Sequence, residues 1–252
     1  MDAEITQPHT KLMKLTLAVE DSRAYWAHTQ PEMDRSRSVL AAFEGRWFGD
    51  KRMPRIREIM ADFRNRYDAF PPALAVLRRW RPADPTIRQL ICHWHLQLAD
   101  PLYRDFAGPF LDARRRHPEP RIDPDAVVRW LRERIDDRWA VSTVRKVARN
   151  LITAATEAGL CEPGRHPRTL THPPVPDTAL AYLLYLLRRT TFSGTLLDNP
   201  YLASVGLAGR PLETRLRRLP GVTFSRMGDL VSFEWDYPDL EAWAENTLDG
   251  TF

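Results

Sequence analysis

The sequence predicts a mainly α protein in which an N-terminal helical subdomain precedes a winged-helix-like C-terminal part with a small β-hairpin. Apolar side chains recur every three or four residues through most of the chain, which is the spacing of helices with one buried face. Prolines preceded by an acidic residue mark the start of several of these helices. Alternation of apolar and polar residues, typical of strands, is clearest in residues 222–235.

The chain of 252 residues is long enough for two subdomains with a sizeable core. Its first ten residues lack the basic start and apolar block of a secretory signal. The longest apolar run, residues 179–187, is about half of what a bilayer span requires, so it predicts a buried core helix. We therefore expect a cytoplasmic protein without a membrane partner. The two cysteines fit a reducing compartment and give no disulfide framework.

Residues 1–10 are expected to be a disordered tail, and residues 11–116 the N-terminal helical subdomain with almost no strand. Helical patterns cover residues 11–29, 33–43, 54–67, 72–80, 85–98 and 102–116. Asp84 before Pro85 is a clear start signal, because an acidic cap and a proline at the first helical position both favour a helix start. The polar, proline-rich residues 117–124 are expected to be the linker to the second subdomain.

Residues 125–252 are expected to form the winged-helix-like part, and residues 136–160 are its most informative segment. A helix over residues 123–134 and a second, Ser-capped helix over residues 142–158 would form a helix-turn-helix-like pair. The second helix has a regular apolar face, which includes Val144, Val147 and Leu151. Its other face carries hydroxyl, amide and basic groups, which can bind phosphates and base edges. The predicted DNA contacts on this helix are Ser142, Thr143, Arg145, Lys146, Arg149 and Asn150.

The segment after this helix has the position and size of a wing, with a Pro-Gly turn between short extended pieces. It places Arg165 and Arg168 beside the proposed DNA-reading helix. A helix followed by a hairpin is then predicted a second time. The helix covers residues 211–219, and the hairpin covers residues 222–235 and turns near Met227-Gly228-Asp229. Arg215, Arg217, Arg218 and Arg226 are expected to be secondary phosphate contacts there.

Positive charge is concentrated in the body of the chain. From residue 229 onward there are seven acidic residues and no lysine or arginine, so the first 228 residues carry a net charge of +11. Most of these cations are arginines, which can bind phosphates and guanine with two parallel hydrogen bonds. We expect the acidic end, residues 229–252, either to limit indiscriminate DNA binding or to dock another protein.

No sequence motif points to catalysis or to a bound cofactor. The chain has no GxxxxGK[ST], GxGxxG, GxSxG or HExxH pattern. His93 and His95 are two residues apart and would diverge by about 200° on a helix, so they are expected to be core or surface histidines and not metal ligands. Cys161, His166 and His172 lack a standard zinc spacing. We therefore expect no catalytic residue, no metal site, no cofactor and no enzymatic activity.

Several segments together resemble the BrxA family, small accessory proteins of the BREX phage-defence systems. They are SRSVLAAFEGRWFG, QLICHWHLQLADPLYRDF, WAVSTVRKVARNLITAATEAGL and NPYLASVGL with the hairpin that follows. The resemblance covers most of the chain from about residue 36 onward, although each motif is short. It implies a cytoplasmic, mainly helical, non-enzymatic protein that binds double-stranded DNA beside other components of an antiviral defence complex. The C-terminal segment is longer than in the shortest family members, so the resemblance says little about it.

Two other functional classes fit the same residues. In one, the protein is an interaction adaptor whose basic face meets an acidic protein partner. In the other, it is a winged-helix transcriptional regulator with a defined operator, which would need a symmetric dimer, and the sequence contains no visible dimerisation heptad.

Overall fold

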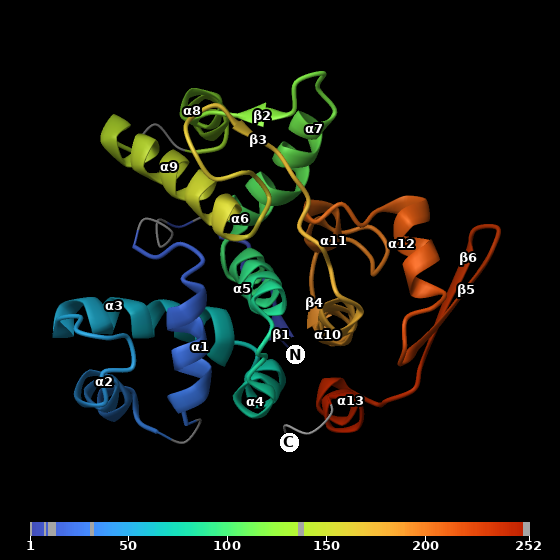
Figure 1. Ribbon diagram of the computed structural model, residues 1–252, viewed down its shortest axis with the longest axis horizontal. Helices are drawn as coiled ribbons and strands as arrows, with labels where there is room; N and C mark the ends of the chain where they lie inside the picture. The colour runs from blue at the N-terminus through green and yellow to red at the C-terminus, as the bar shows by residue number, and fades with distance from the viewer. Residues whose placement is uncertain (1, 8, 10–13, 31–32, 136–138, 249–252) are drawn as a thin grey trace.

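We analysed a computed structural model of the chain, which describes residues 2–7, 9, 14–30, 33–135 and 139–248. The protein is mainly α with a few short strand pairs, as predicted (Figure 1). Within the described part of residues 11–116 there is no strand. None of the helices in the described ranges combines the length and apolar character needed to cross a membrane.

The N-terminal helices pack around α5, which lies in the middle of the molecule (Figure 1). Residues 90–99 of this helix are all buried, so helices cover it on every side. Two short π-helical turns, η2 and η3, interrupt the helical chain before α4 and α7. The elements of this part are α1 (Val19–His28), α2 (Arg35–Glu44), α3 (Met53–Phe63), η2 (Arg64–Asp68), α4 (Pro71–Trp80), α5 (Pro85–Ala99), α6 (Pro101–Asp105), η3 (Phe106–Phe110) and α7 (Leu111–Arg115).

The acidic residues predicted to start helices do cap them. The Asp84 carboxylate accepts a hydrogen bond of 2.7 Å from the backbone N–H of Thr86, with Pro85 in the first turn of α5. Asp123 accepts one of 2.8 Å from the backbone N–H of Ala126 at the start of α8. Each carboxylate satisfies a backbone donor that has no partner inside its helix.

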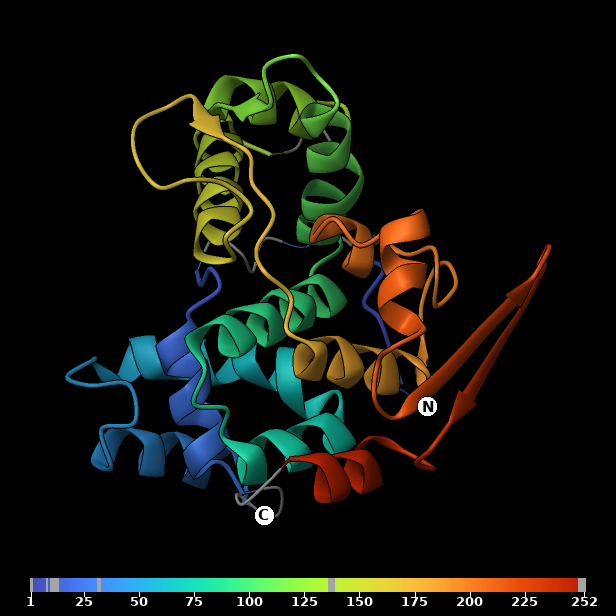
Figure 2. The ribbon, with the colours of Figure 1, turned by 45° about the vertical axis from the view of Figure 1, so that its right-hand side comes forward.

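The next elements have the order of a winged helix. After α7 come a short strand, two helices and a second short strand: β2 (Arg121–Ile122), α8 (Pro124–Arg132), α9 (Val141–Glu157) and β3 (Arg168–Thr169). Strands β2 and β3 pair antiparallel, and an isolated antiparallel bridge joins Cys161 to Leu170. This places the segment between α9 and β3 in the position of a wing beside α9 (Figure 2).

A second group of elements follows: α10 (Asp177–Leu187), β4 (Thr190–Thr191), α11 (Pro200–Ser204), α12 (Gly209–Leu216), β5 (Val222–Met227) and β6 (Leu230–Trp235). Within it a strand, two helices and a strand again follow one another, but here β4 pairs with β1 (Asp2–Ala3), and β5 pairs with β6. The hairpin of β5 and β6 turns at Gly228, whose φ of +60° suits a glycine, and it projects from the body (Figure 2). The predicted hairpin over residues 222–235 is thus confirmed. Helix α13 (Leu240–Thr247) follows it.

Several predicted boundaries differ from the structure. Residues 1–10 were expected to be disordered, but β1 (Asp2–Ala3) pairs in parallel with β4. The first helix begins at Val19 and not at residue 11, and residue 11 itself lies outside the described residues. The expected linker, residues 117–124, contains β2, and one continuous core cluster includes buried side chains from both sides of it. Sequence patterns did not show these features because they depend on contacts between distant parts of the chain.

Candidate nucleic-acid interface

Helix α9 has the two faces that the sequence predicts. Val144, Val147, Leu151, Ala154, Ala155 and Ala158 are all buried. They hold the helix against the core, and α8 packs beside it. The opposite face is left to the solvent.

Three cations on that outer face have no acidic partner among the residues that the structure describes. Arg145, Lys146 and Arg149 are exposed, and none of them forms an ion pair with a residue in the described part of the chain. Arg145 and Arg149 also line a hollow of about 300 Å³ together with Pro124, Asp125 and Val128 from α8. An unpaired guanidinium or ammonium group at the surface can bind phosphate without first breaking an internal contact.

The uncharged predicted contacts on α9 are less uniform. Ser142 is exposed, but it does not cap the helix: α9 begins one residue earlier, and Ala140 at the cap position has no side-chain hydrogen bond. The prediction of a Ser-capped start is therefore wrong: the cap position lies two residues before Ser142, and the Ser142 hydroxyl lies in the first turn. Thr143 and Asn150 are half-buried. These two side chains can contribute at most the rim of an interface.

The wing residues separate into an exposed cation and an anchored one. Arg165 is exposed, and no described acidic residue pairs with it. Arg168 is half-buried: its Nη1 donates to the Thr156 hydroxyl at 2.5 Å and its Nε donates to the Gly164 carbonyl at 3.2 Å. Arg168 therefore ties the wing loop to α9, and Arg165 is the wing cation that stays exposed.

Most of the predicted cationic contacts on α12 and the β5–β6 hairpin already pair with other groups of the protein. Arg215 pairs with Asp177 and donates to the Val175 carbonyl at 2.8 Å. Arg226 and Arg217 both approach Glu213, at 2.5 and 4.0 Å. Arg218 is exposed and has no acidic partner among the described residues. The structure thus concentrates available positive charge on α9 and its wing more than on α12 and its hairpin.

Arg115 supports the wing in a way that sequence reasoning missed. In the sequence it belongs to a triplet of arginines at a helix end, which is typical of local capping. In the structure its Nη2 donates to the Thr171 carbonyl at 2.9 Å and to the Leu160 carbonyl at 3.5 Å, on the two sides of the wing. Burial lowers the pKa of Arg115 to about 10. No sequence pattern marks this role, because both partners lie far along the chain.

The buried histidines are core residues, as expected. His93 contacts the Tyr103 and Ser204 hydroxyls at 2.8 and 2.9 Å, and His95 contacts the Arg66 carbonyl and the Tyr182 hydroxyl at 2.8 Å each. Burial lowers the pKa of His93 to about 3 and that of His95 to about 4, so both rings stay neutral near pH 7.

The described ranges contain neither an activated cysteine nor a cluster of metal ligands. Burial raises the pKa of both Cys92 and Cys161, which disfavours the reactive thiolate form. Within residues 2–7, 9, 14–30, 33–135 and 139–248, no group of three or more His, Cys, Asp or Glu side chains could hold a metal ion.

No protein-family model matches the sequence, and no curated protein matches it either. Among solved structures, the fold is similar to that of an uncharacterized protein from Magnetospirillum magneticum, with a TM-score of 0.57 and 18% sequence identity. The similarity covers 73% of this chain and 97% of the other. At this identity it concerns the fold alone.

Proposed function

We propose that the chain is a non-enzymatic, cytoplasmic protein that binds double-stranded DNA through α9 and its wing. The observation that carries the proposal is a set of exposed cations on one helix face that form no ion pair within the described ranges: Arg145, Lys146 and Arg149. The helix order around α9 supports it, because a helix-turn-helix places its second helix in the major groove. Arg165, which is exposed on the wing, is a fourth cation of the proposed interface.

The biological setting of this binding rests on the sequence resemblance described above. We propose that the protein is an accessory component of a BREX-type phage-defence system, where it works beside other proteins of the complex. An accessory role needs only DNA binding and protein contacts, which agrees with the lack of a catalytic motif in the sequence.

A salt titration of DNA binding tests the interface. Each phosphate contact releases counterions, so log K falls against log salt with a slope of about −0.9 per contact. The triple variant Arg145→Ala, Lys146→Ala, Arg149→Ala is expected to flatten this slope by up to about 2.7. Its melting temperature should change little, because the three side chains lie off the buried face of α9.

The matched control removes the same charge elsewhere. Arg37, Arg52 and Arg57 are exposed on or beside α2 and α3, and no described acidic residue pairs with them. Arg114, Arg115 and Arg116 would be a poor control, because Arg114 and Arg115 bind backbone carbonyls. Equal flattening in both triple variants would indicate a diffuse field and contradict the assignment to α9, as would an unchanged slope in the α9 variant.

The adaptor function has one observation in its favour. Met227 and Leu230 at the tip of the projecting hairpin are 77% and 76% exposed, and apolar side chains at a protruding tip favour contact with another protein. If the protein is purely an adaptor, random duplex DNA should not bind even at low salt. Binding at low salt would retain the DNA proposal, and the hairpin could still contact a partner.

A further inference from the structure

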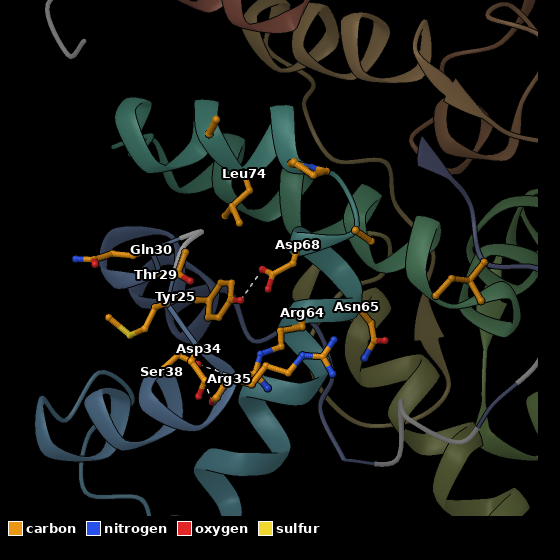
Figure 3. Close-up of a pocket in the computed structure, with 15 residues that line it drawn as sticks. Tyr25, Thr29, Gln30, Asp34, Arg35, Ser38, Arg64, Asn65, Asp68 and Leu74 are labelled. Atoms are coloured by element: carbon orange, nitrogen blue, oxygen red, sulfur yellow. Dashed lines mark hydrogen bonds between the residues drawn. The ribbon is translucent and has the colours of Figure 1, made fainter. Parts of the chain in front are cut away.

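A cavity of about 810 Å³ lies between α1, α2, η2 and α4, away from the α9 surface (Figure 3). This volume is within the range of about 300–1,000 Å³ that is usual for small-molecule sites. Part of its wall is η2, a π-helical turn, and such turns occur frequently at functional sites. The function proposed above makes no use of this cavity.

One end of the cavity carries two arginines, together with the Asp34 carboxylate that caps the start of α2. Arg35 is the first residue of α2 and is exposed, and its side chain forms no ion pair with a described residue. Arg64 begins η2, and its Nη2 donates to the Arg35 carbonyl at 3.0 Å and to the Ser38 hydroxyl at 2.8 Å. These contacts hold the Arg64 guanidinium in place while its other N–H groups remain available. Figure 3 shows the two guanidinium groups beside each other. Paired guanidinium groups suit a phosphate.

A fixed hydrogen-bond acceptor lies farther along the cavity. The Tyr25 hydroxyl donates to Oδ1 of Asp68 at 2.6 Å (Figure 3). Burial and the Asp68 charge raise the pKa of Tyr25, so the phenol keeps its proton and remains a donor. This contact orients the Asp68 carboxylate, which can accept further hydrogen bonds from a ligand.

The rest of the wall includes apolar surface from Met33, Pro71, Leu74 and Ala75. In Figure 3, Leu74 lies at one end, Tyr25 and Asp68 lie between, and Arg35 and Arg64 lie at the other end. A complementary ligand therefore combines an apolar ring, an N–H donor and an anionic group.

We propose that this cavity binds a nucleoside monophosphate whose base carries an exocyclic amine. The phosphate binds Arg35 and Arg64, the amine donates to Asp68, and the base lies against Leu74. Hydrogen bonds within the protein already hold two of these groups, Arg64 and Asp68, in place.

The test is calorimetric titration of the full chain with AMP, CMP, UMP and adenosine. AMP and CMP should bind saturably. UMP, which has a carbonyl where CMP has the amine, and adenosine, which lacks the phosphate, should each bind at least about tenfold more weakly, because a lost charge-assisted hydrogen bond costs about that factor. Failure of AMP and CMP to bind at millimolar concentration would overturn the proposal.

Variants locate the site and separate it from the DNA surface. Arg35→Ala should weaken AMP at least about tenfold, whereas Arg37→Ala, an exposed arginine on the same helix but outside the cavity, should not change AMP binding. Asp68→Ala should weaken CMP toward the affinity of UMP without weakening UMP, an effect that general loss of structure would not produce. The α9 triple variant should bind AMP normally. AMP binding that survives Arg35→Ala, or that is lost in the α9 variant, would refute the site.

Discussion

The backbone N–H of Leu17 donates a hydrogen bond of 2.8 Å to Oε2 of Glu157, the last residue of α9. The Thr16 hydroxyl donates to the other carboxylate oxygen at 3.0 Å. From another side, the buried Arg66 guanidinium donates to the carbonyls of Leu15, Thr16 and Leu17 at 3.0, 2.7 and 3.2 Å. This short extended segment therefore fastens the N-terminal helices to the end of the proposed DNA-reading helix.

Removal of the Glu157 carboxylate should destabilise the protein. Glu157→Ala leaves the N–H of the fully buried Leu17 without its partner, and hydrogen bonds to charged groups contribute about 1.5–3 kcal/mol. We expect the free energy of unfolding, measured by urea denaturation, to fall by about that amount. Glu162→Ala is the control, because this nearby side chain is exposed. An equal effect of both substitutions would show that the Glu157 contacts contribute nothing specific.

The extended segment is a part of the fold that the sequence pattern predicts wrongly. Periodicity predicts a helix over residues 11–29, and the helix begins only at Val19. Residues 15–17 instead direct their backbone carbonyls to Arg66, about fifty positions away in the chain. A local pattern cannot show that these carbonyls bind a distant arginine and not the N–H groups of a helix. Helices with strong start signals, such as α5 and α8, were predicted to within a few residues because their caps lie in the same few residues as the pattern.

The candidate interface was predictable to the same degree. The buried and polar faces of α9 follow from spacing alone, and the structure has both. The availability of each arginine does not follow from spacing. Arg215 and Arg168 belong to basic segments in the sequence, yet Asp177, Thr156 and backbone carbonyls already bind them. Identification of free cations requires the tertiary partners.

The buried histidines should make stability depend on pH. Their folded-state pKa values, about 3 for His93 and about 4 for His95, lie below the value of about 6.5 expected after unfolding. Between about pH 6.5 and 4 the unfolded chain therefore binds more protons, and stability falls as the pH falls. Each histidine contributes up to about 1.4 kcal/mol per pH unit in that window.

Urea denaturation at several pH values checks this expectation. His95→Gln should be less stable than the parent at pH 7, because it loses packing and hydrogen bonds, and it should show a shallower decline between pH 6.5 and 4.5. His117→Gln, at an exposed position, should decline like the parent protein. A parallel decline in the parent and the His95 variant would mean that other groups cause the acid sensitivity.

The two wing arginines should respond differently to substitution. Arg165→Ala is expected to reduce the salt slope of DNA binding by about 0.9 without altering the melting temperature, because the side chain is exposed and unpaired in the described part of the chain. Arg168→Ala should instead lower the melting temperature, because it removes the bonds to Thr156 and Gly164. Thermal unfolding and DNA titration of both variants decide the matter. Identical behaviour of the two variants would contradict the division into a free and an anchored arginine.

The acidic C-terminal helix holds two separable features, a buried anchor and exposed charge. Trp243 is 2% exposed and stacks on Tyr185 at a centroid distance of 5.7 Å. Glu241 and Glu245 lie on the surface, where they pair with Arg79 at 3.2 and 2.9 Å. Truncation before α13 would remove both features at once, so point substitutions are the better test of whether the acidic end limits DNA binding.

We expect Trp243→Ala to cost about 3–5 kcal/mol of unfolding free energy, as large-to-small substitutions of buried aromatic residues do. The double variant Glu241→Gln, Glu245→Gln should change stability by no more than about 1 kcal/mol, because exposed ion pairs contribute little. If these charges oppose DNA, the double variant should bind random duplex more tightly at low salt, and the difference should shrink as salt screens the charges. Unchanged affinity at low salt would show that these two carboxylates do not limit DNA binding.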